Sequence, residues 1–241
     1  TKSVYVQANW APDRFENEAA WVQKTAIETG WPHAVVGFAD FTGADVRPQL
    51  DRLAEYPLLR GVRQQIHWHE NEMYRFASTP DLAEDASFQR NVGRLADYGW
   101  SFDLQVFAGQ MKGAAALAEA CPEVTFVLQH AGMLEDLSEG GRAEWRAGME
   151  ALAARPNIVT KLSAFGTFIH RNDAGHIADM VGQTVAMFGA ERCLFGSNFP
   201  IEKLWTDYGA LIGAFTDAAA DLPESGRRAV FEGTAQRVYR I

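Results

Sequence analysis

Seven short segments rich in β-branched and aromatic residues recur along the chain, and each ends in glycine or polar residues. Apolar residues at helical spacing follow them, and a glycine or a proline such as Gly30, Gly99 or Pro156 ends the helical pattern. Apolar strands that alternate with amphipathic helices are typical of a parallel sheet covered by helices. We expect strands over residues 3–9, 33–40, 58–68, 101–107, 124–132, 157–166 and 192–198.

Two α/β folds share this alternation, an open doubly wound sheet and a (β/α)8 TIM barrel. A nucleotide-binding open sheet would carry a glycine-rich phosphate motif after a strand, and neither GxGxxG nor GxxxxGK[ST] occurs. Polar residues instead follow several different strands, which favours the barrel. They are Gln7, Asn9, Asp40, residues 63–69, His130, Lys161, Ser163, Ser197 and Asn198. Seven strands do not close a standard barrel, so we expect one strand to be absent from the sequence.

Composition limits the domain organisation and the partners. The 241 residues are 47% hydrophobic and 22% charged, which fits one globular domain over residues 1–241. No apolar run approaches the roughly 20 residues that span a bilayer, and no signal peptide opens the chain, so we expect a cytoplasmic protein. The net charge of -9 argues against nucleic-acid and anionic-membrane partners and favours a small molecule. Cys121 and Cys193 lack CxxC spacing and are expected to be buried thiols.

Four of the strand segments carry a resemblance to a known family. They read LRGVRQQIHW at residues 59–68, FVLQHAG at 126–132, NIVTKLSAFG at 157–166 and RCLFGSNFP at 192–200. In these motifs and their order the chain resembles the amidohydrolase superfamily. The resemblance is to the branch with 2-pyrone-4,6-dicarboxylate lactonase and the lactonases of fuconolactone and rhamnonolactone. It extends over essentially the whole chain.

The resemblance also implies what is missing. Members of the family carry an HxH pair on the first strand, whereas HWH at residues 67–69 follows the family's fourth strand. We therefore expect an N-terminal segment with that strand to precede Thr1 in the intact protein. The resemblance leaves the cofactor open, either a divalent metal such as Zn or Mn or none.

The reaction that the resemblance implies is hydrolysis of a lactone by direct attack of water. Histidines or a divalent cation polarise the carbonyl, arginines hold acid groups, and an aspartate after the eighth strand deprotonates the water. Here Asn198 replaces that aspartate, and an amide accepts no proton and is a weak metal ligand. We expect His67, His69 or Glu70 to supply the base, although a solvated loop is the alternative for this cluster.

The remaining candidates each have a functional and a structural interpretation. His130 is expected at the barrel mouth as a catalytic residue, and as a ligand if a metal is bound, but a buried structural histidine would look similar. Arg63 is expected to grip a substrate carboxylate, with Lys161 and Gln7 also contacting the substrate. Internal ion pairs are the alternative for both cations. Ser163 lacks the GxSxG context of a nucleophile and is interpreted as a structural hydroxyl, as is Ser197.

Three functions remain open at this level. The first is a lactone hydrolase, in which a neighbour replaces the missing aspartate. The second is a metal-dependent decarboxylase of the same superfamily, and the third is an inactive barrel that binds a small acid.

Overall fold

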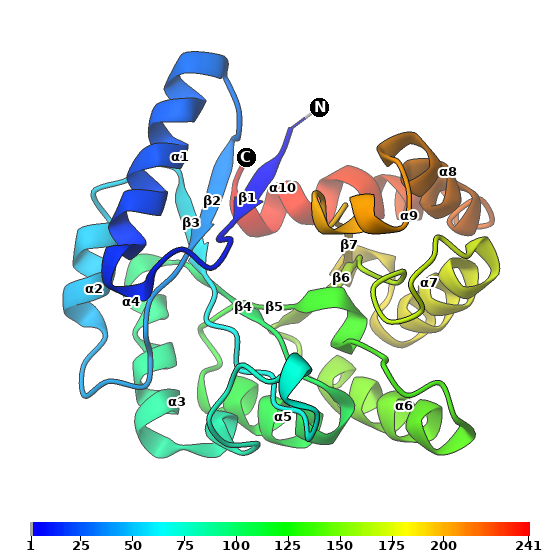
Figure 1. Ribbon diagram of the computed structural model, residues 1–241, viewed down its shortest axis with the longest axis horizontal. Helices are drawn as coiled ribbons and strands as arrows, with labels where there is room; N and C mark the ends of the chain where they lie inside the picture. Colours follow the sequence, from blue (N-terminus) through cyan, green and yellow to red (C-terminus); the bar gives the residue numbers. More distant parts are fainter. Residues whose placement is uncertain (1) are drawn as a thin grey trace.

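The computed structural model describes residues 2–241, and its central feature is one seven-stranded parallel sheet (Figure 1). Every strand pairs with the next strand along the chain. The strands are β1 (Val4–Val6), β2 (Ala34–Gly37), β3 (Leu59–Val62), β4 (Ser101–Leu104), β5 (Phe126–Leu128), β6 (Ile158–Leu162) and β7 (Cys193–Phe195).

The strand order confirms the predicted barrel class. A doubly wound sheet reverses its strand order at a switch point, whereas here β1 to β7 follow one another and curl into a barrel wall with β1 and β7 at its edges. Each observed strand lies inside a predicted one but is shorter. The expected strand over residues 58–68, for example, is regular only over Leu59–Val62, because the polar residues after it form the loop at the mouth.

Helices connect each strand to the next on the outside of the sheet, and three more helices follow β7 (Figure 1). The helices are α1 (Phe15–Thr29), α2 (Arg47–Leu53), α3 (Ala86–Gly93), α4 (Leu95–Tyr98), α5 (Met111–Ala120), α6 (Glu139–Ala153), α7 (Ala174–Phe188), α8 (Tyr208–Ala218), α9 (Glu224–Arg228) and α10 (Thr234–Tyr239). Gly30 and Gly99 end α1 and α4 in the left-handed conformation, at φ 80° and 63°, as their sequence positions predict.

The C-terminal helix α10 fills the inside of the curled sheet, which the sequence pattern did not predict. Val238 and Tyr239 pack against inward-facing strand residues such as Val36, Val127 and Leu194. The opposite faces of the strands pack against the surrounding helices in the larger core. The alternation of side chains along each strand thus produces two apolar layers, one inside the curl and one outside it.

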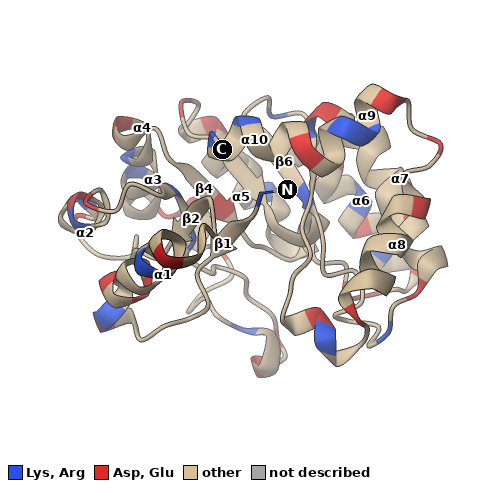
Figure 2. Cartoon of the chain, turned by 90° about the horizontal axis from the view of Figure 1, so that it is seen from above, with Lys and Arg blue, Asp and Glu red and all other residues tan. Residues whose placement is uncertain are grey.

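Basic and acidic residues are interspersed along the outer helices (Figure 2). Cys121 and Cys193 are buried free thiols, as expected, and burial raises the pKa of the Cys121 thiol to about 11. Within residues 2–241, the structure contains no helix with both the length and the apolar character needed to cross a bilayer.

Candidate active site at the carboxyl ends of the strands

Left-handed backbone conformations gather at the carboxyl ends of several strands. Asn9 follows β1, His130 follows β5, Ala164 follows β6 and Asn198 follows β7, with φ values between 52° and 60°. Non-glycine residues rarely adopt these angles, and such strain concentrates at functional sites. The polar strand ends predicted from the sequence therefore coincide with unusual backbone geometry at one end of the barrel wall.

His130 lies at this end of the barrel wall and contacts the end of β6. Its Nδ1 is 2.8 Å from the Ser163 Oγ at the end of β6. Burial lowers the pKa of the imidazole well below its usual value, and the nearby cations Lys161 and Arg63 lower it further. His130 is therefore neutral at physiological pH, so the ring can donate one hydrogen bond and accept another.

Arg63 is a cation without a carboxylate partner in the described part of the chain. One terminal nitrogen, Nη2, donates to the backbone carbonyl of Gln7, and the buried Nε has no partner. Burial lowers the pKa of the guanidinium, which Asp103 and Glu18 partly offset from a distance. A half-buried guanidinium whose Nε has no partner is suited to a carboxylate ligand.

Gln7, predicted to bind substrate, is itself buried and supports the turn after β1. Its side-chain oxygen accepts a hydrogen bond from the backbone N–H of Asn9 at 2.7 Å, and its carbonyl holds Arg63. Both contacts are with protein atoms, so Gln7 orients Arg63.

Lys161 forms a buried ion pair, the structural alternative considered for it. Its Nζ lies 3.0 Å from the Asp103 Oδ2 and 3.1 Å from the Gln129 side-chain oxygen. Gln129 also donates to the same Asp103 oxygen at 2.9 Å, and the Tyr239 hydroxyl approaches the carboxylate at 3.4 Å. Burial lowers the pKa of Lys161, whereas Asp103 opposes that shift.

His67 is enclosed by aromatic rings. Its centroid lies 4.7 Å from that of Phe76 and 5.6 Å from that of Phe107. Burial, with a contribution from Arg63, lowers its pKa to about 4, and its buried Nδ1 has no hydrogen-bond partner. A neutral imidazole of such low pKa is a weak proton acceptor near pH 7.

The other two base candidates differ in their surroundings. The His69 Nδ1 accepts from the Asn71 backbone N–H at 3.0 Å, and its Nε2 lies 3.7 Å from a Glu135 oxygen. Both ring nitrogens are therefore directed at protein groups. Glu70 is exposed, and its backbone carbonyl accepts a hydrogen bond from the Arg75 side chain.

Asn198 interacts with a carboxylate that was not a sequence candidate. Its Nδ2 donates to the Glu202 Oε1 at 3.2 Å, and Glu202 is only 1% exposed although it lies in the loop after β7. Among the described residues, no hydrogen bond joins Asn198 to His130.

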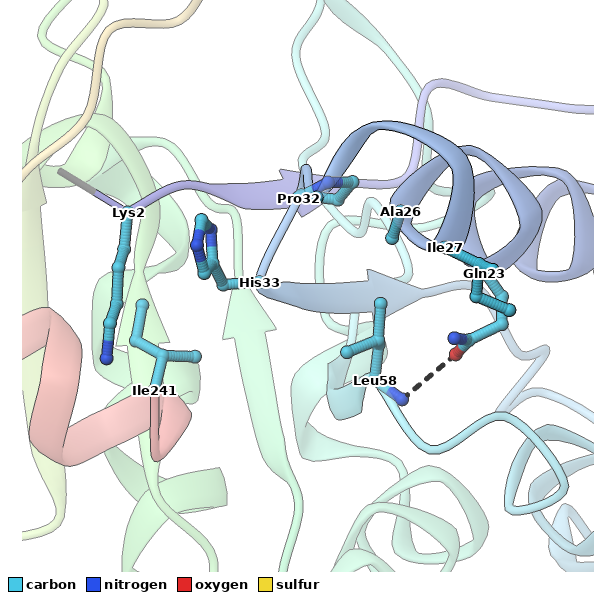
Figure 3. Close-up of a pocket in the computed structure, with 9 residues that line it drawn as sticks. Lys2, Gln23, Ala26, Ile27, Pro32, His33, Leu58 and Ile241 are labelled. Carbon is cyan, nitrogen blue, oxygen red and sulfur yellow. Dashed lines mark hydrogen bonds between the residues drawn. The ribbon is translucent and has the colours of Figure 1, made fainter.

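The structure has one pocket beside His130 and another at the opposite end of the strands. A narrow one with room for about one water molecule, about 10 Å³, lies between His130, His176 and mainly apolar side chains such as Phe168 and Met180. A larger pocket of about 360 Å³ lies at the opposite end, where Lys2, His33 and Ile241 face one another (Figure 3). Barrel enzymes place their chemistry at the carboxyl ends of the strands, so we assign the site to the end with His130.

The residues at the mouth do not by themselves form a metal site. Among residues 2–241, His, Cys, Asp and Glu side chains form no group of three or more that could hold an ion. A protein metal site normally needs three or four ligands, so His130 would need ligands beyond those that residues 2–241 bring together.

Sequence reasoning missed Asp103, Tyr239 and Glu202. A signal existed for Asp103, because it lies between apolar residues in the middle of a predicted strand and is thus a candidate for a buried ion pair. Glu202 follows Asn198 by one turn, but nothing in its charged and aromatic surroundings marks it as buried. No signal marked Tyr239.

Known proteins resemble the chain over its whole length. It matches the amidohydrolase family over residues 2–241. It is 31% identical to an L-fucono-1,5-lactonase of Burkholderia multivorans, over 99% of this chain and 80% of that protein. A protein of Sinorhizobium fredii named y4mH is 32% identical, over 100% of this chain and 80% of that protein.

Solved structures agree with this result. An amidohydrolase from Burkholderia multivorans with bound zinc superposes with a TM-score of 0.85 at 30% identity, over 100% of this chain and 83% of that one. A 2-pyrone-4,6-dicarboxylic acid hydrolase from Pseudomonas putida, named as putative, superposes with a TM-score of 0.70 at 20% identity, over 99% and 82% of the two chains, which shows the shared fold alone. By sequence and by fold, the chain belongs to the amidohydrolase family.

Proposed function

We propose that the protein hydrolyses a small lactone that carries a carboxylate group. The observation that carries this proposal is the half-buried Arg63, a cation without an ion-pair partner in the described residues, which lies close enough to the neutral His130 for its charge to lower the pKa of that imidazole. Arg63 lowers the pKa of His130 and of His67, so its charge acts on both imidazoles. The lactonase named among the relatives supports the reaction class.

In this proposal Arg63 binds the carboxylate and so brings the lactone carbonyl to His130. With the Ser163 hydroxyl donating to Nδ1, the imidazole carries its proton on Nε2 and keeps it there while the N–H donates a hydrogen bond to the carbonyl oxygen. Water adds to the carbonyl carbon, the ring C–O bond breaks, and one water proton ends on the ring oxygen. The product is a hydroxy acid, which ionises and releases a proton.

Proton release gives a direct test. We would measure it with a pH indicator for pairs of lactones of the same ring size, with and without a carboxylate. We expect turnover with a higher kcat/KM for the carboxylated member, and loss of that preference in Arg63→Met. Preference for the neutral member that Arg63→Met leaves unchanged would contradict the proposal, as would no turnover of either.

Asn198 supports a second candidate function, a barrel that binds a carboxylated ligand without converting it. Loss of a general base typically costs about 10²- to 10⁴-fold in rate. Calorimetric binding of a carboxylated lactone that releases no proton over hours would favour this function over hydrolysis.

A further inference from the structure

Glu202 is a buried carboxylate at the candidate site. It lies in the 3-10 turn Ile201–Leu204 after β7, and its side chain is almost completely inaccessible. Its Oε1 accepts from the Asn198 Nδ2 at 3.2 Å and from the Thr167 Oγ1 at 3.0 Å. Its Oε2 is buried without a hydrogen-bond partner in the described residues. Such groups are costly to bury and call for a functional explanation.

The loop after β6 leaves room for this carboxylate. A Cβ atom at Gly166 would lie 2.8 Å from the Glu202 Oε2 and 2.9 Å from the Arg171 carbonyl oxygen. Thr167, the next residue, supplies one of the two side-chain donors. Loops from two strand ends therefore meet around Glu202.

Asn198 and Glu202 are also joined through their backbones. The Glu202 N–H donates to the Asn198 carbonyl at 3.2 Å, and Asn198 has a φ of 52°. A carboxylate oxygen only accepts hydrogen bonds, so it must face the Nδ2 of the amide. The Asn198 Oδ1 is consequently turned away from Glu202.

We propose that Glu202 is a positioning residue, which holds the Asn198 amide so that Oδ1 accepts a hydrogen bond from the attacking water. This inference rests on the proposed function. In this pair the negative charge belongs to Glu202, one turn after Asn198, which is the position where the family's aspartate is expected. His67, His69 and Glu70 are then not needed to orient the water.

The contact between Asn198 and Glu202 predicts how Asn198→Asp will affect stability. The new carboxylate would lie beside the Glu202 carboxylate, and two like charges in contact raise the pKa of one of them. We expect Asn198→Asp to lower the thermal midpoint, and more at pH 8 than at pH 5, because protonation relieves the repulsion. In the double variant Asn198→Asp with Glu202→Gln the amide and the carboxylate exchange places, so the midpoint should recover at pH 8.

Kinetics separate a positioning role from a structural one. On the best carboxylated lactone, we expect Glu202→Gln and Glu202→Ala to lower kcat by about tenfold or more with little change in KM, because the orientation of water matters after the substrate is bound. The double variant should have a higher kcat than Glu202→Gln alone. Its profile of kcat against pH should show a new titration of a carboxylate. Thr167→Val, which removes only the second donor to Oε1, serves as the matched control and should change kcat less.

Two results would overturn the proposal. The first is that Glu202→Gln and Glu202→Ala both keep the wild-type kcat and pH profile while their thermal midpoints fall, which would make Glu202 purely structural. The other is an Asn198→Asp midpoint that Glu202→Gln does not restore. If the wild-type protein turns over no lactone, the proposed function fails and the water-orienting role with it, whereas the thermal midpoints still decide whether the two side chains are coupled.

Discussion

The Lys161 ammonium lies 3.0 Å from the Asp103 carboxylate, and both side chains are buried inside the curled sheet. Removing one partner of a buried pair leaves the other charge uncompensated, which typically costs about 3 to 5 kcal/mol. We expect Lys161→Met to lower the free energy of unfolding by about this amount in urea titrations. Lys24→Met removes an exposed pair with Glu28 and should cost about 1 kcal/mol or less. Equal losses would contradict a structural role for Lys161.

Arg63 should behave in the opposite way, because it has no ion-pair partner in the described residues and we propose that it binds a substrate carboxylate. We expect Arg63→Met to raise KM for a carboxylated lactone at least tenfold, equivalent to about 1.4 kcal/mol of binding, while the midpoint falls by only a few degrees. Arg63→Lys keeps the charge but loses the planar donor pair, so its KM should lie between those of the wild type and Arg63→Met. A large loss of stability with unchanged KM would mark Arg63 as structural.

Gly61 of β3 pairs with Ser101 of β4 and has no room for a side chain. A Cβ atom there would lie 2.2 Å from the Ser101 Oγ and 3.0 Å from the Ser101 carbonyl oxygen. Gly61→Ala should therefore lower the free energy of unfolding by about 1 to 3 kcal/mol. Gly43→Ala, where nothing lies within 4 Å, is the matched control and should stay within about 0.5 kcal/mol. Similar denaturation midpoints for the two variants would contradict the packing at Gly61.

The fold was largely predictable because apolar periodicity and glycine stops act locally. All seven strand segments contain a strand, and the polar residues that follow them lie at one end. Strand lengths were overestimated, because β propensity continues into loops such as residues 63–68 that tertiary contacts bend away. The position of α10 inside the sheet was not predictable, since it depends on contacts between Tyr239 and residues more than a hundred positions away.

The site was predictable in residue type more than in residue role. His130 and Arg63 lie where the strand ends suggested, because the end of a parallel strand points its next residue into the mouth. The roles depend on partners distant in sequence. Lys161 is paired with Asp103, 58 residues earlier in the chain, and no local pattern states which partner a buried charge finds.

Burial of His67 should make stability depend on pH. Its folded-state pKa is lowered from 6.5 to about 4, so the unfolded chain binds a proton that the native state does not between these values. The free energy of unfolding should therefore fall as the pH drops from 6.5 to 4, by on the order of 3 kcal/mol for this group. In urea titrations at pH 7 and 4.5, His67→Leu should show a smaller decrease than the wild type. An unchanged decrease would assign the effect to other groups.

His130 should be the residue to which activity is most sensitive. We expect His130→Ala to lower kcat by about 10²- to 10⁴-fold, because the carbonyl oxygen loses its donor. His176 lines the same pocket without a contact to Ser163 among the described hydrogen bonds, so His176→Ala is the matched control and should cost much less. Because the pKa of His130 lies well below its usual value, kcat should stay level as the pH falls from 7.5 to 6, rather than decline through the ordinary histidine range. Measuring kcat against pH for the wild type and both variants checks this. A wild-type decline centred near pH 6.5 that disappears in His130→Ala would mean that His130 works in a solvated environment and that the carbonyl donor has to be sought elsewhere.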